Sequence, residues 1–140
     1  MCNNNIIIIR GRAGTYKSSL AQILINTFND KKCCYIDVEG NKDLKLNDNI
    51  YIYKGNIKEF ATIETLINDN DVIVIDYMSL LNIYINDNDL LNNLCKLVKG
   101  NAKTLILVEC ISSQRDIMLD ERYKELKTKA DLIITLDRNV

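Results

Sequence analysis

The sequence predicts an α/β fold of three layers, in which helices cover both faces of a parallel sheet. Apolar runs bounded by turn residues alternate with helix-like stretches along the chain. Two of these runs, Val72–Ile75 and Leu105–Val108, are continuously apolar, which is typical of central strands covered on both faces. The length of 140 residues and the apolar content of 47% are those of one globular domain with a substantial core.

Turn residues and polar residues mark the ends of the expected strands. We expect strands at about Ile6–Arg10, Cys33–Val38, Ile50–Tyr53, Val72–Asp76, Thr104–Glu109 and Leu132–Leu136. Helices are expected between them, at about Lys17–Asn29, Ile57–Asn68, Asn88–Lys99 and Leu119–Lys129. The third of these helices has an apolar stripe that stops at Lys99-Gly100, a good helix end. No repeat, linker or second domain is visible, so residues 1–140 are expected to form a single domain.

The first expected strand leads into a glycine loop and then into a helix. A triphosphate is bound where backbone N–H groups converge before a helix N-terminus, with a lysine for the β/γ oxygens and a hydroxyl for Mg²⁺. Four isoleucines, Ile6 to Ile9, precede the loop, and Lys17 and Ser18 supply the lysine and the hydroxyl. The predicted phosphate-binding residues, for ATP with Mg²⁺, are Gly11, Arg12, Ala13, Gly14, Thr15, Tyr16, Lys17, Ser18 and Ser19. The alternative is an ordinary strand-to-helix turn with an exposed lysine.

Tyr16 departs from the pattern G-x-x-x-x-G-K-[ST], because it stands where the second glycine belongs. A tyrosine is tolerated there if its backbone has a negative φ, since only a positive φ would demand glycine. The ring would then project from the loop, over the nucleotide or toward a neighbouring subunit.

Two strands that end in acids supply further candidates. Val72–Ile75 runs straight into Asp76, which we expect to hold Mg²⁺ together with Ser18; the alternative is that Asp76 caps the next segment. Glu39 follows another strand at the same sheet edge, where it could orient or deprotonate the attacking water. The alternative for Glu39 is a solvated strand end. Asp37 faces the same side, deeper in the sheet.

Composition excludes several other classes of site. The chain has no histidine, which rules out a histidine-based triad or a histidine-ligated metal. Its five cysteines lack CxxC spacing, so we expect buried thiols in a reducing compartment. No run approaches the roughly 18 apolar residues of a membrane span, and no signal peptide is visible, so a cytoplasmic protein without membrane contact is expected. The net charge of −1 gives no overall attraction to nucleic acid, which local loops would have to contact.

In this order, the segments resemble the RecA-fold P-loop ATPases, including replicative helicases, recombinases and RecA-like ATPases of phages and plasmids. The matching segments are the G-x-x-G-x-x-K-S loop, Tyr35–Gly40, Asn49–Tyr53, Val74–Leu81 and Ala130–Ile134. Ile75–Leu81 is similar to the helicase branch and Ile36–Gly40 to the recombinase branch, while an aromatic residue before the lysine is similar to phage and plasmid variants.

The resemblance implies roles for individual residues. Lys17 and Ser18 would bind phosphate and Mg²⁺, Asp76 would bind Mg²⁺, and Glu39 would be the catalytic glutamate. The polar sensor of the family is not clearly matched: Glu109 has roughly its place, and the polar residues that follow are Ser112, Ser113 and Gln114. Family members carry a basic finger for the neighbouring subunit on a hairpin after the final strand, and this hairpin is not matched in the sequence. The cation would therefore come from another protein or from Arg115, Lys127, Lys129 or Arg138.

Three functions remain. The favoured one is a minimal RecA-like ATPase that couples ATP binding or hydrolysis to a nucleic-acid task, such as replication or recombination, or to assembly. The second is a nucleotide-binding regulator with little turnover. The third, a small P-loop kinase, is disfavoured because the segment Gln114–Lys129 is not an arginine-rich lid. We expect the isolated chain to be a monomer or weak oligomer with slow turnover, which self-association or a partner ATPase would raise.

Overall fold

The computed structural model describes residues 5–12, 14–40, 42–78, 81, 85, 89–110 and 128–136. The elements, in chain order, are β1 (Ile6–Gly11), α1 (Lys17–Asn26), β2 (Cys33–Asp37), β3 (Ile50–Lys54), α2 (Phe60–Asn68), β4 (Val72–Asp76), α4 (Leu90–Lys99), β5 (Thr104–Cys110) and β6 (Leu132–Leu136). The strands form one sheet in the order β3-β2-β4-β5-β1-β6, and every neighbouring pair is parallel.

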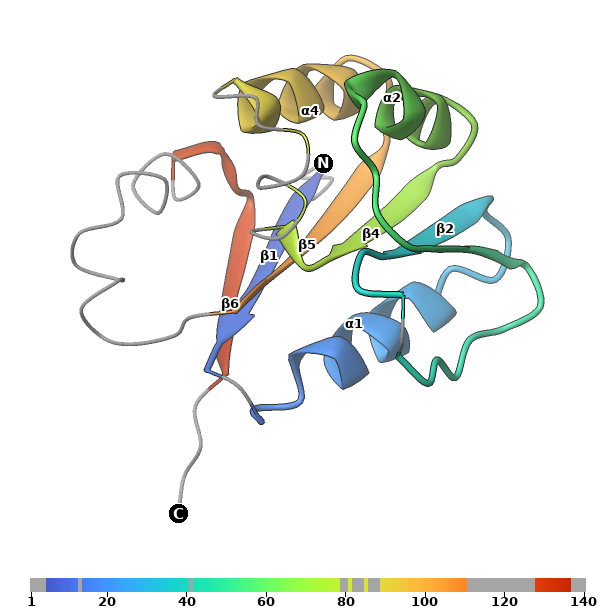
Figure 1. The fold of residues 1–140 in the computed structure, drawn as a ribbon, viewed down its shortest axis with the longest axis vertical. Helices are drawn as coiled ribbons and strands as arrows, with labels where there is room; N and C mark the ends of the chain where they lie inside the picture. Colours follow the sequence, from blue (N-terminus) through green and yellow to red (C-terminus); the bar gives the residue numbers. More distant parts are fainter. Residues whose placement is uncertain are drawn as a thin grey trace.

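Helices cover the sheet on both faces, as Figure 1 shows: α1 lies on one face, and α2 and α4 lie side by side on the other. The apolar side chains divide accordingly into two buried clusters. One cluster packs β-strand residues such as Ile9 and Val74 against Ala21 and Ile25 of α1. The other packs the alternate strand residues against α2 and α4. The predicted three-layer α/β fold is therefore confirmed.

The predicted strands agree with the observed ones to within one residue at each end. The two continuously apolar runs became β4 and β5 in the middle of the sheet, as expected, and all five residues of β4 are buried. Burial on both faces explains the missing alternation, because a polar residue on either face of such a strand would lie in a core.

The helices differ more from their predicted ranges. α1 ends at Asn26 rather than Asn29, because Thr27 and Phe28 donate N–H bonds to carbonyls three residues back and tighten the last turn. α2 begins at Phe60 rather than Ile57, since Ile57 is buried in the core before the helix starts. α4 begins at Leu90 rather than Asn88 and ends at Lys99, with Gly100 as its C-cap, as predicted. The predicted helix at 119–129 lies almost entirely outside the described residues.

The parallel register brings the carboxyl ends of several strands to one edge of the sheet. Asp37 of β2 is the register partner of Asp76 of β4, and Asp76 is the partner of Val108 of β5. β5 lies between β4 and β1, so it separates Asp76 from the loop after β1. Ligands of open parallel sheets bind beyond this edge. Among the described residues, no helix is long and apolar enough to cross a membrane.

Candidate functional site

The loop after β1 is shaped by its two glycines. A Cβ atom on Gly11 would lie 2.6 Å from the carbonyl oxygen of Leu136 and 2.6 Å from Oγ1 of Thr15, so no other residue fits without a shift. Gly14 has a φ of 79°, which side-chain-bearing residues rarely adopt. The Thr15 hydroxyl donates a hydrogen bond of 2.7 Å to the carbonyl of Arg12. The loop therefore turns back on itself directly before α1.

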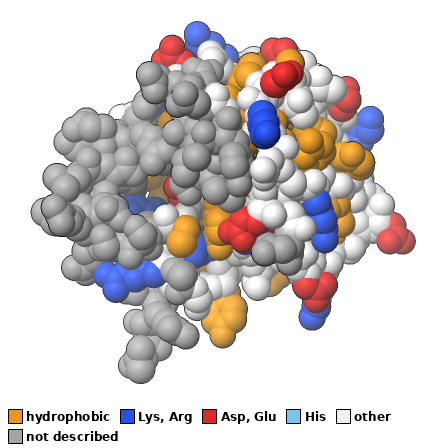
Figure 2. Space-filling model, in the orientation of Figure 1, with side chains coloured by type: hydrophobic (Ala, Val, Ile, Leu, Met, Phe, Trp, Pro, Cys, Tyr) orange, Lys and Arg blue, Asp and Glu red, His pale blue; other side chains and the backbone are white. Residues whose placement is uncertain are grey.

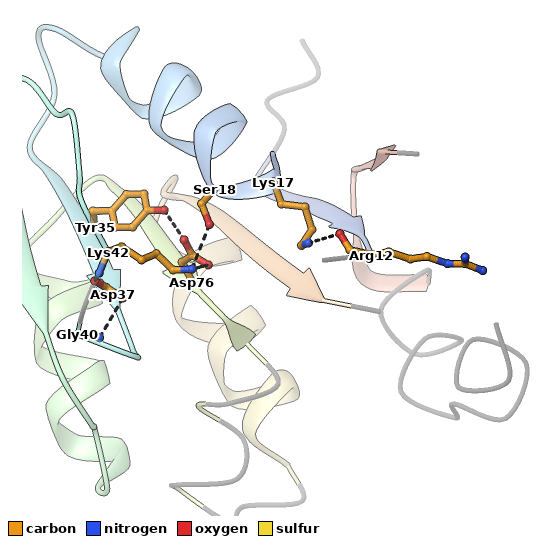
Figure 3. Close-up of polar contacts among 8 residues, drawn as sticks. All are labelled: Arg12, Lys17, Ser18, Tyr35, Asp37, Gly40, Lys42 and Asp76. Carbon is orange, nitrogen blue, oxygen red and sulfur yellow. Dashed lines mark hydrogen bonds and ion pairs between the residues drawn. The ribbon is translucent and has the colours of Figure 1, made fainter. Parts of the chain in front are cut away.

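Lys17, the first residue of α1, points back into this loop (Figure 3). Its side chain is buried at 3% exposure, and Nζ donates a hydrogen bond of 2.7 Å to the carbonyl oxygen of Arg12. Burial lowers the pKa of Lys17, while the charges of Cys110 and Asp76 act in the opposite direction. Lys17 is therefore not the exposed lysine that the alternative of an ordinary turn assumes. A neutral carbonyl holds the ammonium, and an anionic oxygen would bind it more strongly.

Tyr16 does not have the negative φ that would make a tyrosine readily tolerated there. Its φ of 63° and ψ of 31° place it in the left-handed region, directly before α1. The condition under which a tyrosine would be tolerated without strain is therefore not met. For a residue other than glycine, the left-handed conformation costs about 1–2 kcal/mol. The Tyr16 side chain is 79% exposed, so packing within the described chain does not offset that cost.

Asp76 is the buried acid of the site. Its residue is fully buried at the end of β4, and Oδ2 accepts a hydrogen bond from the hydroxyl of Tyr35. Oδ1 has no hydrogen-bond donor among the described residues. The ammonium of Lys42 lies 3.5 Å from Oδ1, close enough for an ion pair but long for a hydrogen bond. One oxygen of a buried carboxylate therefore remains open to a ligand.

Tyr35 was not singled out from the sequence, where it reads as an ordinary strand residue. It is fully buried in β2, on the α1 face of the sheet. Burial raises the pKa of Tyr35, and the charge of Asp76 and their hydrogen bond raise it further. The hydroxyl stays protonated at physiological pH and remains a donor to the carboxylate. Tyr35 thus fixes the orientation of Asp76.

The oxygens of Ser18 and Asp76 are of the kind that Mg²⁺ prefers. Ser18 Oγ and Asp76 Oδ1 lie 3.3 Å and 3.5 Å from a single atom, the Nζ of Lys42, so both oxygens already contact the same cation. Hydroxyl and carboxylate oxygens suit Mg²⁺, which takes few protein ligands and keeps waters or phosphates for the rest. No cluster of three or more histidine, cysteine or acidic side chains in the described ranges could hold a metal.

The two acids after β2 have different surroundings. Asp37 is fully buried, and its carboxylate accepts the N–H groups of Gly40 at 3.1 Å and Lys42 at 3.0 Å. Asp37 thus shapes the turn that follows β2. Glu39 is exposed on that turn. Its charge makes a small contribution to raising the pKa of Lys42, which follows on the same turn.

The remaining predicted residues are less closely connected to the site. Glu109 is half-buried at the end of β5 and is the register partner of Arg10. The preceding residue, Val108, packs on the α1 face of the sheet. Because successive residues of a strand point to opposite faces, Glu109 belongs to the other face. Arg12 and Ser19 are exposed, and Lys129 is half-buried. Ala13, Ser112, Ser113, Gln114, Arg115, Lys127 and Arg138 lie outside the described residues.

Lys42 is the second functional residue that the sequence did not indicate. The signal that could have found it is the need of a buried Asp76 for a positive charge. No motif marks the residues after Gly40, so only the folded turn shows which lysine meets that need.

Comparison with known proteins identifies the fold. No protein-family model matches the chain, and no curated protein is significantly similar to it in sequence. Among solved structures, the flagellar accessory protein FlaH from Methanocaldococcus jannaschii matches with a TM-score of 0.68 and 17% identity, over 94% of this chain and 70% of that one. The ATPase domain of G40P matches with a TM-score of 0.68 and 16% identity, over 96% of this chain and 70% of that one. The chain therefore has the RecA-like P-loop ATPase fold.

Proposed function

We propose that the chain binds ATP with Mg²⁺ in the loop between β1 and α1 and acts as a RecA-like ATPase core. The observation that carries this proposal is the buried ammonium of Lys17, held inside the loop by a single backbone carbonyl. A buried cation at a helix N-terminus, beside backbone N–H groups, attracts a polyanion. Lys42 lies close enough to lower the pKa of Lys17, so two positive side chains face this site.

Each residue has a definite task in this proposal. Lys17 exchanges the carbonyl of Arg12 for a phosphate oxygen, and Ser18 and Asp76 hold Mg²⁺. When bound, the metal neutralises charge on the phosphates. Glu39, exposed beyond β2, orients or deprotonates the attacking water.

The task coupled to the nucleotide is assembly or a nucleic-acid reaction. Acidic and basic side chains are interspersed on the described part of the face shown in Figure 2, without a concentrated basic patch. A nucleic acid would accordingly be contacted by a few local groups, because the net charge of −1 gives no general attraction. One solved structure of similar fold is a flagellar accessory protein and the other an ATPase domain, so the fold serves different tasks.

A second candidate is a nucleotide-binding regulator with little turnover. Two observations favour it: Tyr16 has a left-handed conformation that suits glycine, and the ammonium of Lys42 contacts both Ser18 and Asp76. The first feature strains the loop and the second occupies the proposed metal ligands, so both would disfavour hydrolysis more than nucleotide binding.

Calorimetric titration with ATP in excess Mg²⁺ tests the binding proposal. The wild-type chain should bind, and Lys17→Ala should abolish binding, because the loop loses its point charge for the β/γ oxygens. Lys45→Ala is the matched control, since Lys45 is exposed and lies outside the loop. Equal affinities of the wild type and Lys17→Ala would refute the phosphate-loop assignment.

Steady-state turnover then separates the two candidates. Glu39→Gln should keep nucleotide binding but reduce turnover about 100-fold or more, as expected for the loss of a water-orienting base. Assays with and without single-stranded DNA show whether the task involves nucleic acid. Wild-type binding without turnover would favour the regulator, and equal turnover of Glu39→Gln and wild type would make Glu39 a solvated strand end.

A further inference from the structure

The ammonium group of Lys42 contacts both oxygens that the proposed function assigns to Mg²⁺. Its Nζ is 3.3 Å from Oγ of Ser18 and 3.5 Å from Oδ1 of Asp76 (Figure 3). The ring of Tyr77 lies beside it, with the centroid 4.0 Å from Nζ, within the range of a cation–π contact. The Lys42 side chain is only 15% exposed. A cation that belongs to the chain therefore already stands in this position.

Lys42 neutralises the charge of the Asp76 carboxylate but does not donate a hydrogen bond to its Oδ1. The carboxylate of Asp76 is fully buried, and such a group needs a counter-charge. Yet at 3.5 Å the ammonium makes no hydrogen bond to Oδ1, which remains without a donor among the described residues. A smaller divalent ion can approach a carboxylate oxygen more closely, so the place of Lys42 is open to exchange.

The backbone of Lys42 is anchored, while its charged end is held by the site alone. Its N–H donates to Asp37 at 3.0 Å, and its carbonyl accepts Nζ of Lys54 at 3.2 Å. The flexible four-carbon stem can therefore move the ammonium without moving the turn. Glu39 is exposed on the same turn and can accept the ammonium once it leaves Asp76.

We propose that Lys42 is a tethered counter-cation, which neutralises Asp76 while no divalent metal is bound and which Mg²⁺ must displace in order to bind. The inference rests on the proposed function, because it takes Ser18 and Asp76 as the metal ligands. Its consequence is regulatory: the chain keeps a stable metal-free site, and it accepts Mg²⁺ with nucleotide only when the metal concentration suffices to remove the lysine.

The test is the binding of a fluorescent ATP analogue over a series of Mg²⁺ concentrations. In Lys42→Met, the Mg²⁺ concentration that gives the half-maximal effect should fall about tenfold, equivalent to about 1.4 kcal/mol, because no ammonium competes for the position. Lys45→Met makes the same substitution at an exposed position of the same segment and should behave as wild type. Lys42→Arg retains the charge and should retain the wild-type Mg²⁺ requirement.

Thermal unfolding with Mg²⁺ alone provides an independent readout. In EDTA, Lys42→Met should unfold at a lower temperature than Lys45→Met, since Asp76 loses its counter-charge. Added Mg²⁺ should raise the unfolding temperature of Lys42→Met more than that of Lys45→Met. If the wild type binds no analogue at any Mg²⁺ concentration, the proposed function fails, and the unfolding series alone decides the inference. Equal midpoints and equal Mg²⁺ responses of Lys42→Met and Lys45→Met would overturn the inference.

Discussion

The chemistry of the site depends on one buried carboxylate and the side chains arranged around it. Asp76 receives a hydrogen bond from Tyr35 on one oxygen, and the ammonium of Lys42 faces the other. Lys17 lies close enough for Asp76 to act on its pKa. An unpaired carboxylate would be costly at this depth. Removing one of these partners therefore affects both stability and ligand binding.

Tyr35→Phe should destabilise the chain and weaken the proposed binding of Mg²⁺. The substitution removes the donor to Oδ2 of Asp76 and leaves a buried oxygen unsatisfied, which costs about 1–3 kcal/mol. Loss of a group that orients a metal ligand also lowers metal affinity about 10- to 100-fold. Urea unfolding and Mg²⁺-dependent ATP binding measure the two effects. Tyr51→Phe, at a residue that is 56% exposed, is the control, and equal effects of both substitutions would contradict this role of Tyr35.

Tyr16→Gly should stabilise the chain or leave it unchanged. Glycine removes the cost of the left-handed conformation, about 1–2 kcal/mol, although it adds flexibility to the unfolded chain. Tyr16→Ala keeps the conformational cost and separates it from the loss of the ring. ATP affinity within about tenfold of wild type in both variants would mean that the ring does not stack on the base. A loss of more than about tenfold in both, about 1.4 kcal/mol, would show that it does.

Among the structural elements, β1, its loop and α1 depend on the close approach of β6. Gly11 lies at the end of β1, where the carbonyl oxygen of Leu136 leaves no room for a Cβ atom. The neighbouring strand therefore fixes the base of the loop, and the loop fixes the start of α1 with Lys17 and Ser18 on it. The geometry of the phosphate site is thus a property of the sheet as well as of the motif.

Gly11→Ala should reduce stability by about 1–3 kcal/mol, because the backbone of Leu136 and the side chain of Thr15 must shift to admit the methyl group. ATP affinity should fall with it. Gly100→Ala is the control, since a Cβ atom there meets its nearest neighbour at an ordinary 3.5 Å. Chemical unfolding of the two variants measures the difference, and equal stabilities would show that the loop yields easily.

The sequence predicts the elements of this fold well and the contacts of the site only in part. Strand positions follow from apolar runs, because burial on both faces leaves a clear pattern in β4 and β5. Lys17 and Ser18 are singled out by a motif whose spacing reflects phosphate chemistry, and Asp76 by its place at the end of a buried strand. Lys42 and Tyr35 could not be found in this way, since they reach Asp76 from a turn and a strand that only the fold brings beside it. The φ of Tyr16 likewise depends on the entry angle of α1.

At the scale of the whole molecule, the proposed site depends on a cation from outside the chain. ATPases of the RecA-like fold generally complete their site with a basic side chain from a neighbouring subunit. Such a cation can raise the rate of hydrolysis by several orders of magnitude. In the described part of the chain, the two lysines nearest the site, Lys17 and Lys42, already have local partners. We therefore expect the neighbour to supply the missing cation.

The isolated chain should be a monomer or weak oligomer that hydrolyses ATP slowly. Sedimentation analysis combined with turnover assays at increasing protein concentration tests this expectation. If turnover rises with assembly, alanine substitution of Arg115, Lys127, Lys129 and Arg138 identifies the finger. A stable hexamer with fast hydrolysis in the absence of any partner would contradict the expectation.

The central claim is that Lys17 and the loop around it form a phosphate site. A crystal structure of the chain with Mg²⁺ and a non-hydrolysable ATP analogue tests it most directly. We predict that Nζ of Lys17 leaves the carbonyl of Arg12, which it now contacts at 2.7 Å, and binds phosphate oxygens in front of α1. A structure in which Lys17 keeps that carbonyl while the analogue binds elsewhere, or does not bind at saturating concentration, would contradict the claim.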